Sequence, residues 1–341
     1  MQKELSNGPL LDENGNLCEA GFAFRMVKEY DRSKIKAGKS RIKEWDYYYI
    51  GNNSRGVAFT IDDNSLYGLG SVSILDFTNK TYITKSSMKF FTNGKIGFPS
   101  SSSEGDITWK DKNYYLHFVN KDKKRVIDVK VNEYEKGEPF EAHFDLEETM
   151  DDSMVIATPF NKKAHFYYNE KKNCIKAKGY YIYKGEKIEF SDTDTRAILD
   201  WGRGVWTYKN TWYWSGMSTV SDGIELGFNL GYGFGDTSAA SENMLFYDRK
   251  AYKLDDVEFV IPEDSKGNYL YLEPWKIVSH DNQIDLEFTP ILDRCDNTDF
   301  IILKSLQHQV FGVFNGTITV DGVKAKIENV VSFAERVTNY W

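Results

Sequence analysis

The feature that most constrains this chain is a series of short runs, rich in aromatic and β-branched residues, that recur about every ten residues. Residues 45–50, 69–77 and 126–131 are representative. Gly, Asn, Asp and Lys separate the runs, and the 3.6-residue periodicity of an amphipathic helix is nearly absent. About twenty strands at this spacing predict an all-β protein built from antiparallel barrels or sandwiches, with little helix.

Tight-turn sequences support strand hairpins. Asn93-Gly94, Lys184-Gly185 and Asp321-Gly322 each lie between or beside strand-like runs, and such pairs adopt the positive φ angles of two-residue turns. Asn315-Gly316 is either a turn or a bulge, because the apolar pattern continues through it.

The length of the chain favours two domains. Its 341 residues exceed the size at which one hydrophobic core keeps growing, and a small barrel closes with about eight strands. The polar stretch at residues 191–195 is the expected seam, which gives an N-terminal β domain at 1–195 and a C-terminal β domain at 196–341. The final segment, residues 330–341, fits a strand or a short helix.

Charge and composition exclude several classes of function. A net charge of −8 opposes nucleic-acid binding. Cys18, Cys174 and Cys295 are odd in number and far apart, and the five histidines lack metal-ligand spacing, so we expect no disulfide framework, metal or cofactor. We find no signal-peptide pattern and no apolar run long enough to insert into a membrane. A reduced, cytoplasmic location is the expectation.

The densest motif occupies residues 200–214 and holds four of the eight tryptophans. It begins Asp200-Trp201-Gly202-Arg203-Gly204, in which an acid and a base flank glycine. Trp206 and Tyr208 would share one face of a strand, as would Trp212 and Trp214, but a turn at residues 209–211 would leave the relation of the two pairs open.

In this motif the sequence resembles an uncharacterised family with an Asp-Trp-Gly-Arg-Gly signature. The resemblance extends to residues 222–231 with 241–243, to 307–316 and to the tail at 333–337. Thr207 stands where the family is expected to have proline. The family belongs to a lipocalin-like group that includes carotenoid hydratase, tocopherol cyclase and AttH-like proteins. The resemblance implies two tandem lipocalin-like domains with a cavity at or between them, and it leaves the chemistry open.

The candidate site residues each have a structural alternative. Asp200 and Arg203 supply an acid or an anion clamp in a dry pocket, or Asp200 forms an ion pair with Arg203 or another partner while Arg203 stacks on a tryptophan. Glu225 and Asn229 face either a cavity or solvent. His308 is a proton shuttle or a satisfied structural residue. The aromatic candidates, which line a pocket or fill the barrel, are Trp201, Trp206, Tyr208, Trp212 and Trp214. Glu242 and Asn243 face a cavity or solvent, or are turn residues before the next strand, and Gln309 is a ligand-binding candidate beside His308.

Two functions remain in competition, and a carbohydrate-active protein is a distant third. In the first, the protein binds a small apolar or amphipathic molecule, lipid or isoprenoid-like, in an aromatic-lined cavity. In the second, it is a cofactor-independent hydratase, isomerase or cyclase. Asp200 or Glu225 would then donate the proton, assisted by Tyr208 and His308. We expect the binding function first, with the enzyme as the alternative.

Overall fold

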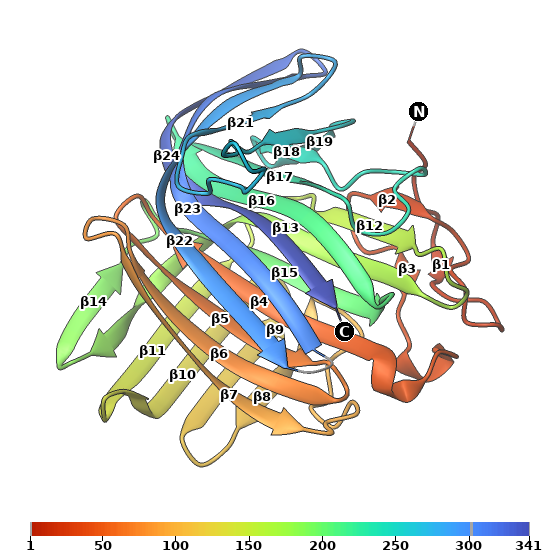
Figure 1. Cartoon of the computed structure of the whole chain (residues 1–341), viewed down its shortest axis with the longest axis horizontal. Helices are drawn as coiled ribbons and strands as arrows, with labels where there is room; N and C mark the ends of the chain where they lie inside the picture. The colour runs from red at the N-terminus through yellow and green to blue at the C-terminus, as the bar shows by residue number, and fades with distance from the viewer. Residues whose placement is uncertain (1, 301–302, 341) are drawn as a thin grey trace.

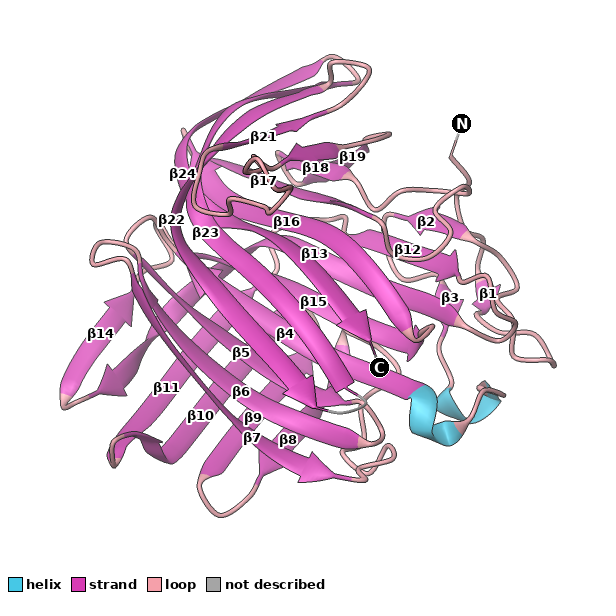
Figure 2. Cartoon of the chain, in the orientation of Figure 1, coloured by secondary structure: helices cyan, strands magenta, loops and turns pink. Residues whose placement is uncertain are grey.

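The protein consists of two curled antiparallel sheets, as Figures 1 and 2 show, so the all-β prediction is confirmed. This computed structural model describes residues 2–300 and 303–340. Within that part of the chain, the helices are two 3₁₀ turns, Arg32–Lys34 and Lys39–Arg41, and neither is long and apolar enough to cross a membrane.

The first sheet has thirteen strands in the described chain and curls into a half-barrel. Its main path runs β7-β6-β5-β4-β15-β13-β11-β10-β9-β8, while β12 and β14 pair with β13, and β2 pairs with β12. A separate parallel pair joins β1 (Gly8–Pro9) to β3 (Lys28–Glu29). The strands are β2 (Gly21–Ala23), β4 (Ile42–Gly51), β5 (Arg55–Asp63), β6 (Tyr67–Asp76), β7 (Thr81–Phe90), β8 (Glu104–Lys110), β9 (Tyr114–Lys121), β10 (Lys124–Glu135), β11 (Glu138–Glu147), β12 (Met154–Pro159), β13 (Phe166–Tyr183), β14 (Glu186–Phe190) and β15 (Arg196–Val205).

The second sheet has nine strands among the described residues, in the order β19-β18-β17-β16-β24-β23-β22-β21-β20. Its three longest strands are β22 to β24, so the tail at residues 330–340 is strand and not helix. The strands are β16 (Lys209–Ser221), β17 (Ile224–Tyr232), β18 (Met244–Tyr247), β19 (Lys250–Lys253), β20 (Glu258–Val260), β21 (Trp275–Val278), β22 (Ile284–Phe300), β23 (Leu303–Val320) and β24 (Val323–Tyr340).

The predicted turns form where the sequence places them. Lys184-Gly185 joins β13 to β14 and Asp321-Gly322 joins β23 to β24, each with positive φ at both residues. At Asn315-Gly316 the pairing of β23 with β24 shifts register, so this pair is a bulge and the strand continues.

The chain changes sheets later than the polar seam at residues 191–195 suggests. Strand β15, which carries the motif, pairs with β13 and β4 in the first sheet. The crossover therefore falls between Val205 and Lys209. The sequence prediction places the motif in the C-terminal domain, because the motif follows the polar stretch at residues 191–195. In the structure one more strand of the first sheet, β15, comes after that stretch and before the crossover.

The two half-barrels pack back to back. Apolar side chains fill the concave side of each sheet, with Phe59, Phe118 and Phe140 in the first and Phe228, Phe288 and Phe314 in the second. A third layer lies between the sheets and includes Tyr47, Tyr49, Trp214, Phe311 and Phe333. Because side chains of the described chain fill both half-barrel interiors, neither interior leaves room for a ligand, and the layer between the sheets holds the candidate site.

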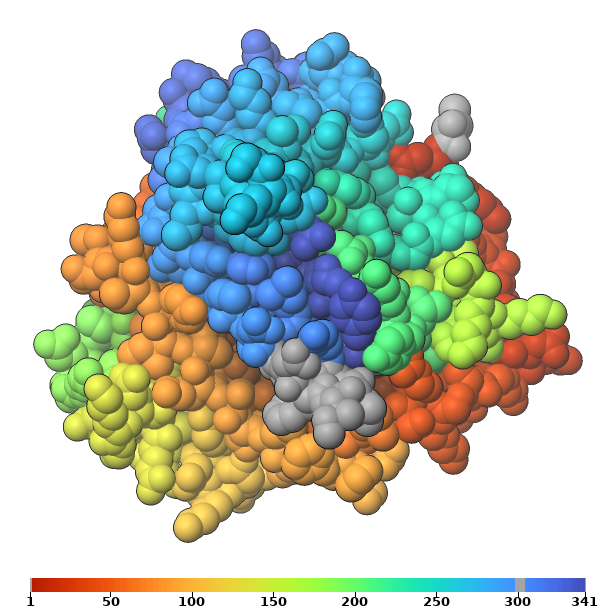
Figure 3. All heavy atoms as spheres, viewed as in Figure 1, coloured from red at the N-terminus to blue at the C-terminus, as the bar shows by residue number. Residues whose placement is uncertain are grey.

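The N-terminal segment ties the two sheets together. The Leu5 amide bonds to Phe22 of the first sheet, whereas the Lys3 amide bonds to Ala239 and Gln2 accepts from the Ser241 amide. In Figure 3 the red N-terminal atoms accordingly lie beside the cyan-green region of the second half.

Candidate functional site

The two faces of the motif strand serve different layers of the molecule. Side chains alternate along a strand, so Trp201 and Arg203 point into the first half-barrel, while Asp200 and Gly202 face the second sheet. The adjacent acid and base of the motif are therefore not partners of each other.

Arg203 is a structural residue of the half-barrel interior. Its guanidinium lies 3.0 Å from Asp46 Oδ1 and 4.0 Å from the ring centroid of Trp201. The side chains of Arg203 and Asp46 are 0% and 1% exposed. Arg203 thus stacks on a tryptophan, and its paired acid is Asp46 and not Asp200.

Gly202 makes room for an indole that the sequence reading did not single out. A Cβ at this position would lie 1.9 Å from the ring of Trp45. Trp45 Nε1 donates to Asp200 Oδ2 at 3.0 Å, and its ring stacks on Tyr167 with an interplanar angle of 8°. The glycine therefore lets Trp45 lie flat over β15 and reach Asp200.

Lys171 of β13 lies at the centre of the charges between the sheets. Its ammonium is 3.0 Å from Asp200 Oδ1, 3.9 Å from Glu242 Oε2 and 3.9 Å from the ring centroid of Trp214. Asn169 Nδ2 also donates to Asp200 Oδ1, at 2.6 Å. We refer below to the inter-sheet cluster, which consists of Trp45, Lys171, Asp200, Trp212, Trp214, Glu242 and Glu335.

Glu335 enters the inter-sheet cluster from β24. Trp212 Nε1 donates to its Oε1 at 3.0 Å, and Gln309 Nε2 donates to its Oε2 at 3.0 Å. Burial raises the pKa of Glu335 to about 7, against the opposing effect of these donors and of Lys171 and Arg294. Burial likewise raises the pKa of Glu242, with Lys171 opposing the shift and Asp200 adding to it.

Three carboxyl groups share this layer with the ammonium of Lys171. Asp200 has the direct contact with Lys171, so Glu242 and Glu335 are the groups that hold a proton more readily than free carboxylic acids do. A carboxylic acid that keeps its proton near neutral pH can act as a general acid.

The tryptophans of the motif differ in their surroundings. Trp206 and Trp214 are buried, and Trp214 donates to Asn229 Oδ1 at 2.7 Å. Trp212 and Trp45 stay half-buried. The side chains of Asp200 and Glu242 are 12% and 13% exposed. These four side chains are therefore the partly accessible members of the inter-sheet cluster.

Several predicted residues have roles outside the inter-sheet cluster. Glu225 forms a two-bond ion pair with Arg196, at 2.7 and 2.8 Å. Tyr208 is 54% exposed in the crossover. Asn243 bonds to the backbone of Gly231 and Asp255. These contacts favour the structural interpretation of each.

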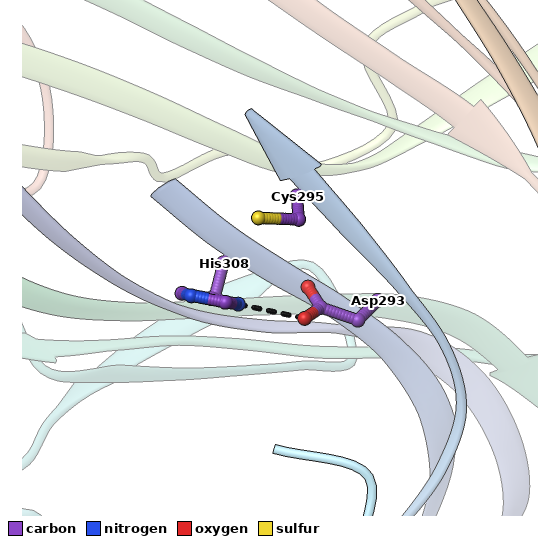
Figure 4. Close-up of side chains that lie close together, drawn as sticks. All are labelled: Asp293, Cys295 and His308. Carbon is purple, nitrogen blue, oxygen red and sulfur yellow. Dashed lines mark hydrogen bonds and ion pairs between the residues drawn. The ribbon is translucent and has the colours of Figure 1, made fainter. Parts of the chain in front are cut away.

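His308 neighbours Gln309 in sequence but faces the opposite side of the second sheet. Its Nδ1 lies 2.6 Å from Asp293 Oδ2, and its ring stacks on Tyr271 with centroids 3.7 Å apart. Figure 4 shows Cys295 beside this pair. Burial and two nearby carboxylates, Asp293 and Asp296, raise the pKa of the Cys295 thiol. His308 is therefore separate from the inter-sheet cluster.

Two surface depressions lie elsewhere. One, of about 320 Å³, is lined in part by Tyr232, Asn243 and Asp255. The other, of about 390 Å³, is lined in part by Glu148 and Lys172. Both have polar and charged residues in their walls, whereas a pocket for an apolar ligand has a mostly apolar lining with few polar groups.

Sequence reasoning missed Trp45, Lys171 and Glu335. Lys171 belongs to a charged run, which reads as a solvated face, and Trp45 lies about 150 residues before Asp200. Glu335 did carry a signal, because it alternates with Phe333 and Val337 on the apolar face of a strand.

The fold and the buried acids define a class: an all-β protein of two curled antiparallel half-barrel sheets with titratable residues between them. The chain belongs to the family described as Domain of unknown function (DUF2804), which matches residues 2–341. No curated protein matches it in sequence.

Two solved structures resemble the chain. A protein assigned as AttH from Nitrosomonas europaea aligns with a TM-score of 0.54 at 14% identity, over 88% of this chain and 93% of that one. Kievitone hydratase from Nectria haematococca aligns with a TM-score of 0.46 at 13% identity, over 100% of this chain and 97% of that one. The first of these likenesses supports the fold.

Proposed function

We propose that the protein is an enzyme that transfers a proton to a small amphipathic molecule, in a hydration, isomerisation or cyclisation reaction. The observation that carries the proposal is the setting of Glu335. This buried acid accepts hydrogen bonds from the Trp212 indole and the Gln309 amide, and burial raises its pKa to about 7. A general acid works best when its pKa lies near the working pH.

The acid would act together with its neighbours. Glu335, or Glu242 across the cluster, would protonate a carbon–carbon double bond, and the π face of Trp45 or Trp212 would stabilise the positive charge that develops. In a hydration, water would then add to the cation and release a proton, which restores the acid. In this scheme Asp200 binds Lys171 and orients Trp45.

The competing function is binding without reaction. The observation that favours it is the saturation of Asp200, which accepts bonds from Trp45, Asn169 and Lys171. A carrier needs the aromatic surface but has no use for an acid that keeps its proton near pH 7.

Incubation in heavy water separates the two functions. Purified protein would be mixed with a panel of isoprenoid alkenes and alkenyl phenols, and deuterium in recovered compounds would be measured by mass spectrometry. We expect incorporation at carbon for at least one compound, and a loss of at least about 100-fold in Glu335→Gln, in line with the contribution of general acids. Glu328→Gln, at an exposed position on the same strand, is the matched control.

A bound compound without deuterium incorporation would support the carrier. Equal incorporation by wild type and Glu335→Gln would remove Glu335 from the mechanism, and Glu242→Gln would then test the second acid. Native mass spectrometry of freshly purified protein identifies the chemical class of any molecule that stays bound.

A further inference from the structure

A second group of reactive side chains lies on the concave side of the second sheet, away from the inter-sheet cluster. Asp293 and Cys295 are two residues apart on β22, so they share one face of the strand. His308 on β23 is directly opposite Cys295. Gln309, the next residue, points the other way and bonds to Glu335.

The three side chains converge. One ligand-type atom from each of Asp293, Cys295 and His308 lies within 4.8 Å of the other two. Figure 4 shows the three side chains close together on neighbouring strands. We propose that Asp293, Cys295 and His308 form a binding site for a divalent transition-metal ion, with zinc as the best-matched metal.

The ligand types favour zinc. Thiolate and imidazole together suit a borderline ion such as Zn²⁺, whereas Ca²⁺ and Mg²⁺ prefer oxygen ligands throughout. Zinc holds its ligands at about 2.0–2.3 Å, which places neighbouring ligand atoms roughly 3.3–3.8 Å apart in a tetrahedron. Side-chain rotations that shift the ligand atoms by about 1 Å would bring the three atoms to that spacing.

Part of the site is already ordered. Stacking on Tyr271, with an interplanar angle of 12°, fixes the imidazole plane, and the Asp293 carboxylate fixes its rotation. Among the described residues, Asp293 Oδ1 is buried and has no hydrogen-bond partner. A bound cation would satisfy this oxygen, which is otherwise an energetic cost.

Access and charge also fit a metal. Cys295 is exposed, so an ion can enter and a water molecule can complete the coordination, as in zinc sites with three protein ligands. On binding, the thiol releases its proton to solvent and coordinates as thiolate. Arg336, opposite His308 on β24, opposes a cation, but its guanidinium is directed to the hydroxyls of Tyr213 and Tyr271.

The same trio resembles a nucleophilic arrangement, in which Asp293 orients His308 and His308 activates Cys295. The carboxylates around Cys295 oppose that reading, because a reactive thiolate needs positive surroundings. The two interpretations differ in the reactivity that they predict for the Cys295 thiol: a metal ligand is protected by zinc, whereas a nucleophile reacts rapidly with or without it.

Metal binding would be measured on the full chain after removal of metal with a chelator under reducing conditions. Zinc would be titrated in competition with a chromophoric chelator, and cobalt(II) would report a sulfur ligand through its thiolate charge-transfer band. We expect one ion per chain, and at least about tenfold weaker binding in Cys295→Ser and in His308→Gln. Cys18→Ser, which removes another exposed thiol, is the matched control and should bind as wild type does.

Alkylation gives a second readout that needs no variant. Zinc should slow the modification of Cys295 by iodoacetamide and leave Cys18 unaffected, as measured by peptide mass spectrometry. Equal zinc affinity in wild type and Cys295→Ser, or a cobalt complex without the sulfur band, would overturn the proposal. Rapid alkylation of Cys295 that zinc does not slow would also overturn it and favour the nucleophile.

Discussion

Strand β15 separates two arrangements of buried charge that differ in their balance. On its concave side, Arg203 meets Asp46 as a one-to-one pair and both are almost fully buried. On its other side, the Lys171 ammonium lies 3.0 Å from Asp200 and 3.9 Å from Glu242, and burial raises the pKa of the nearby Glu335 to about 7. Burial raises the pKa of Asp46 as well, but Asp46 pairs directly with Arg203, whereas Glu335 accepts bonds from the neutral donors Trp212 and Gln309. Glu335 is therefore the better candidate for a group that gives up a proton.

The largest effect should come from removing Arg203 from its buried pair with Asp46. Arg203→Met leaves the Asp46 carboxylate buried without its partner, and we expect unfolding to become easier by about 3–5 kcal/mol. Urea unfolding followed by circular dichroism measures this. Arg249→Met, which breaks the exposed pair with Asp151, should cost less than about 1 kcal/mol. Similar costs for the two variants would contradict the assignment of Arg203 as a structural residue.

The next effect should come from Glu335. Its pKa is raised in the folded protein, so the protonated form stabilises the fold fully below the ordinary carboxyl pKa of 4.5. That stability is lost as the pH rises through about 7. Glu335→Gln cannot ionise, and it should shrink the fall in unfolding free energy between pH 5 and pH 8 by roughly 2–3 kcal/mol.

Urea titrations of both proteins across this pH range give the comparison. Glu242, whose pKa is raised too, contributes with the same sign in both proteins, so the difference isolates Glu335. Glu328→Gln should follow the wild-type profile, because this exposed residue pairs with Lys326 at the surface. Parallel profiles for wild type and Glu335→Gln would contradict the raised pKa.

The sequence predicts the architecture better than the site. Period-two alternation and Asp-Gly or Lys-Gly turns are local signals, and they fixed the all-β class and several hairpins. The position of β15 in the first sheet depends on its pairing with β4, about 150 residues away. Nothing in the residues near β15 indicates that partner. The same is true of the Trp45–Asp200 contact, since both residues come from strands that look alike before they pair.

A smaller effect should come from the glycine that admits Trp45. Gly202→Ala places a methyl group in the Trp45 ring, and we expect a loss of about 1–3 kcal/mol in stability together with a change in tryptophan fluorescence. Gly38→Ala has no heavy atom within 4 Å of the added carbon, so it should be nearly neutral. A neutral Gly202→Ala would mean that Trp45 reaches Asp200 without needing the space.

The smallest effect should come from Tyr208, which belongs to the motif in sequence but not to the inter-sheet cluster. Its ring is 54% exposed and meets Tyr340 edge-on at 6.2 Å, so Tyr208→Ala should change the unfolding free energy by less than about 0.5 kcal/mol. Deuterium incorporation in the alkene assay should stay at the wild-type rate, because the crossover carries Tyr208 away from Glu335. A large loss of incorporation with unchanged stability would instead place the Tyr208 hydroxyl at the reacting atoms. The catalytic group would then have to include the crossover as well as the inter-sheet cluster.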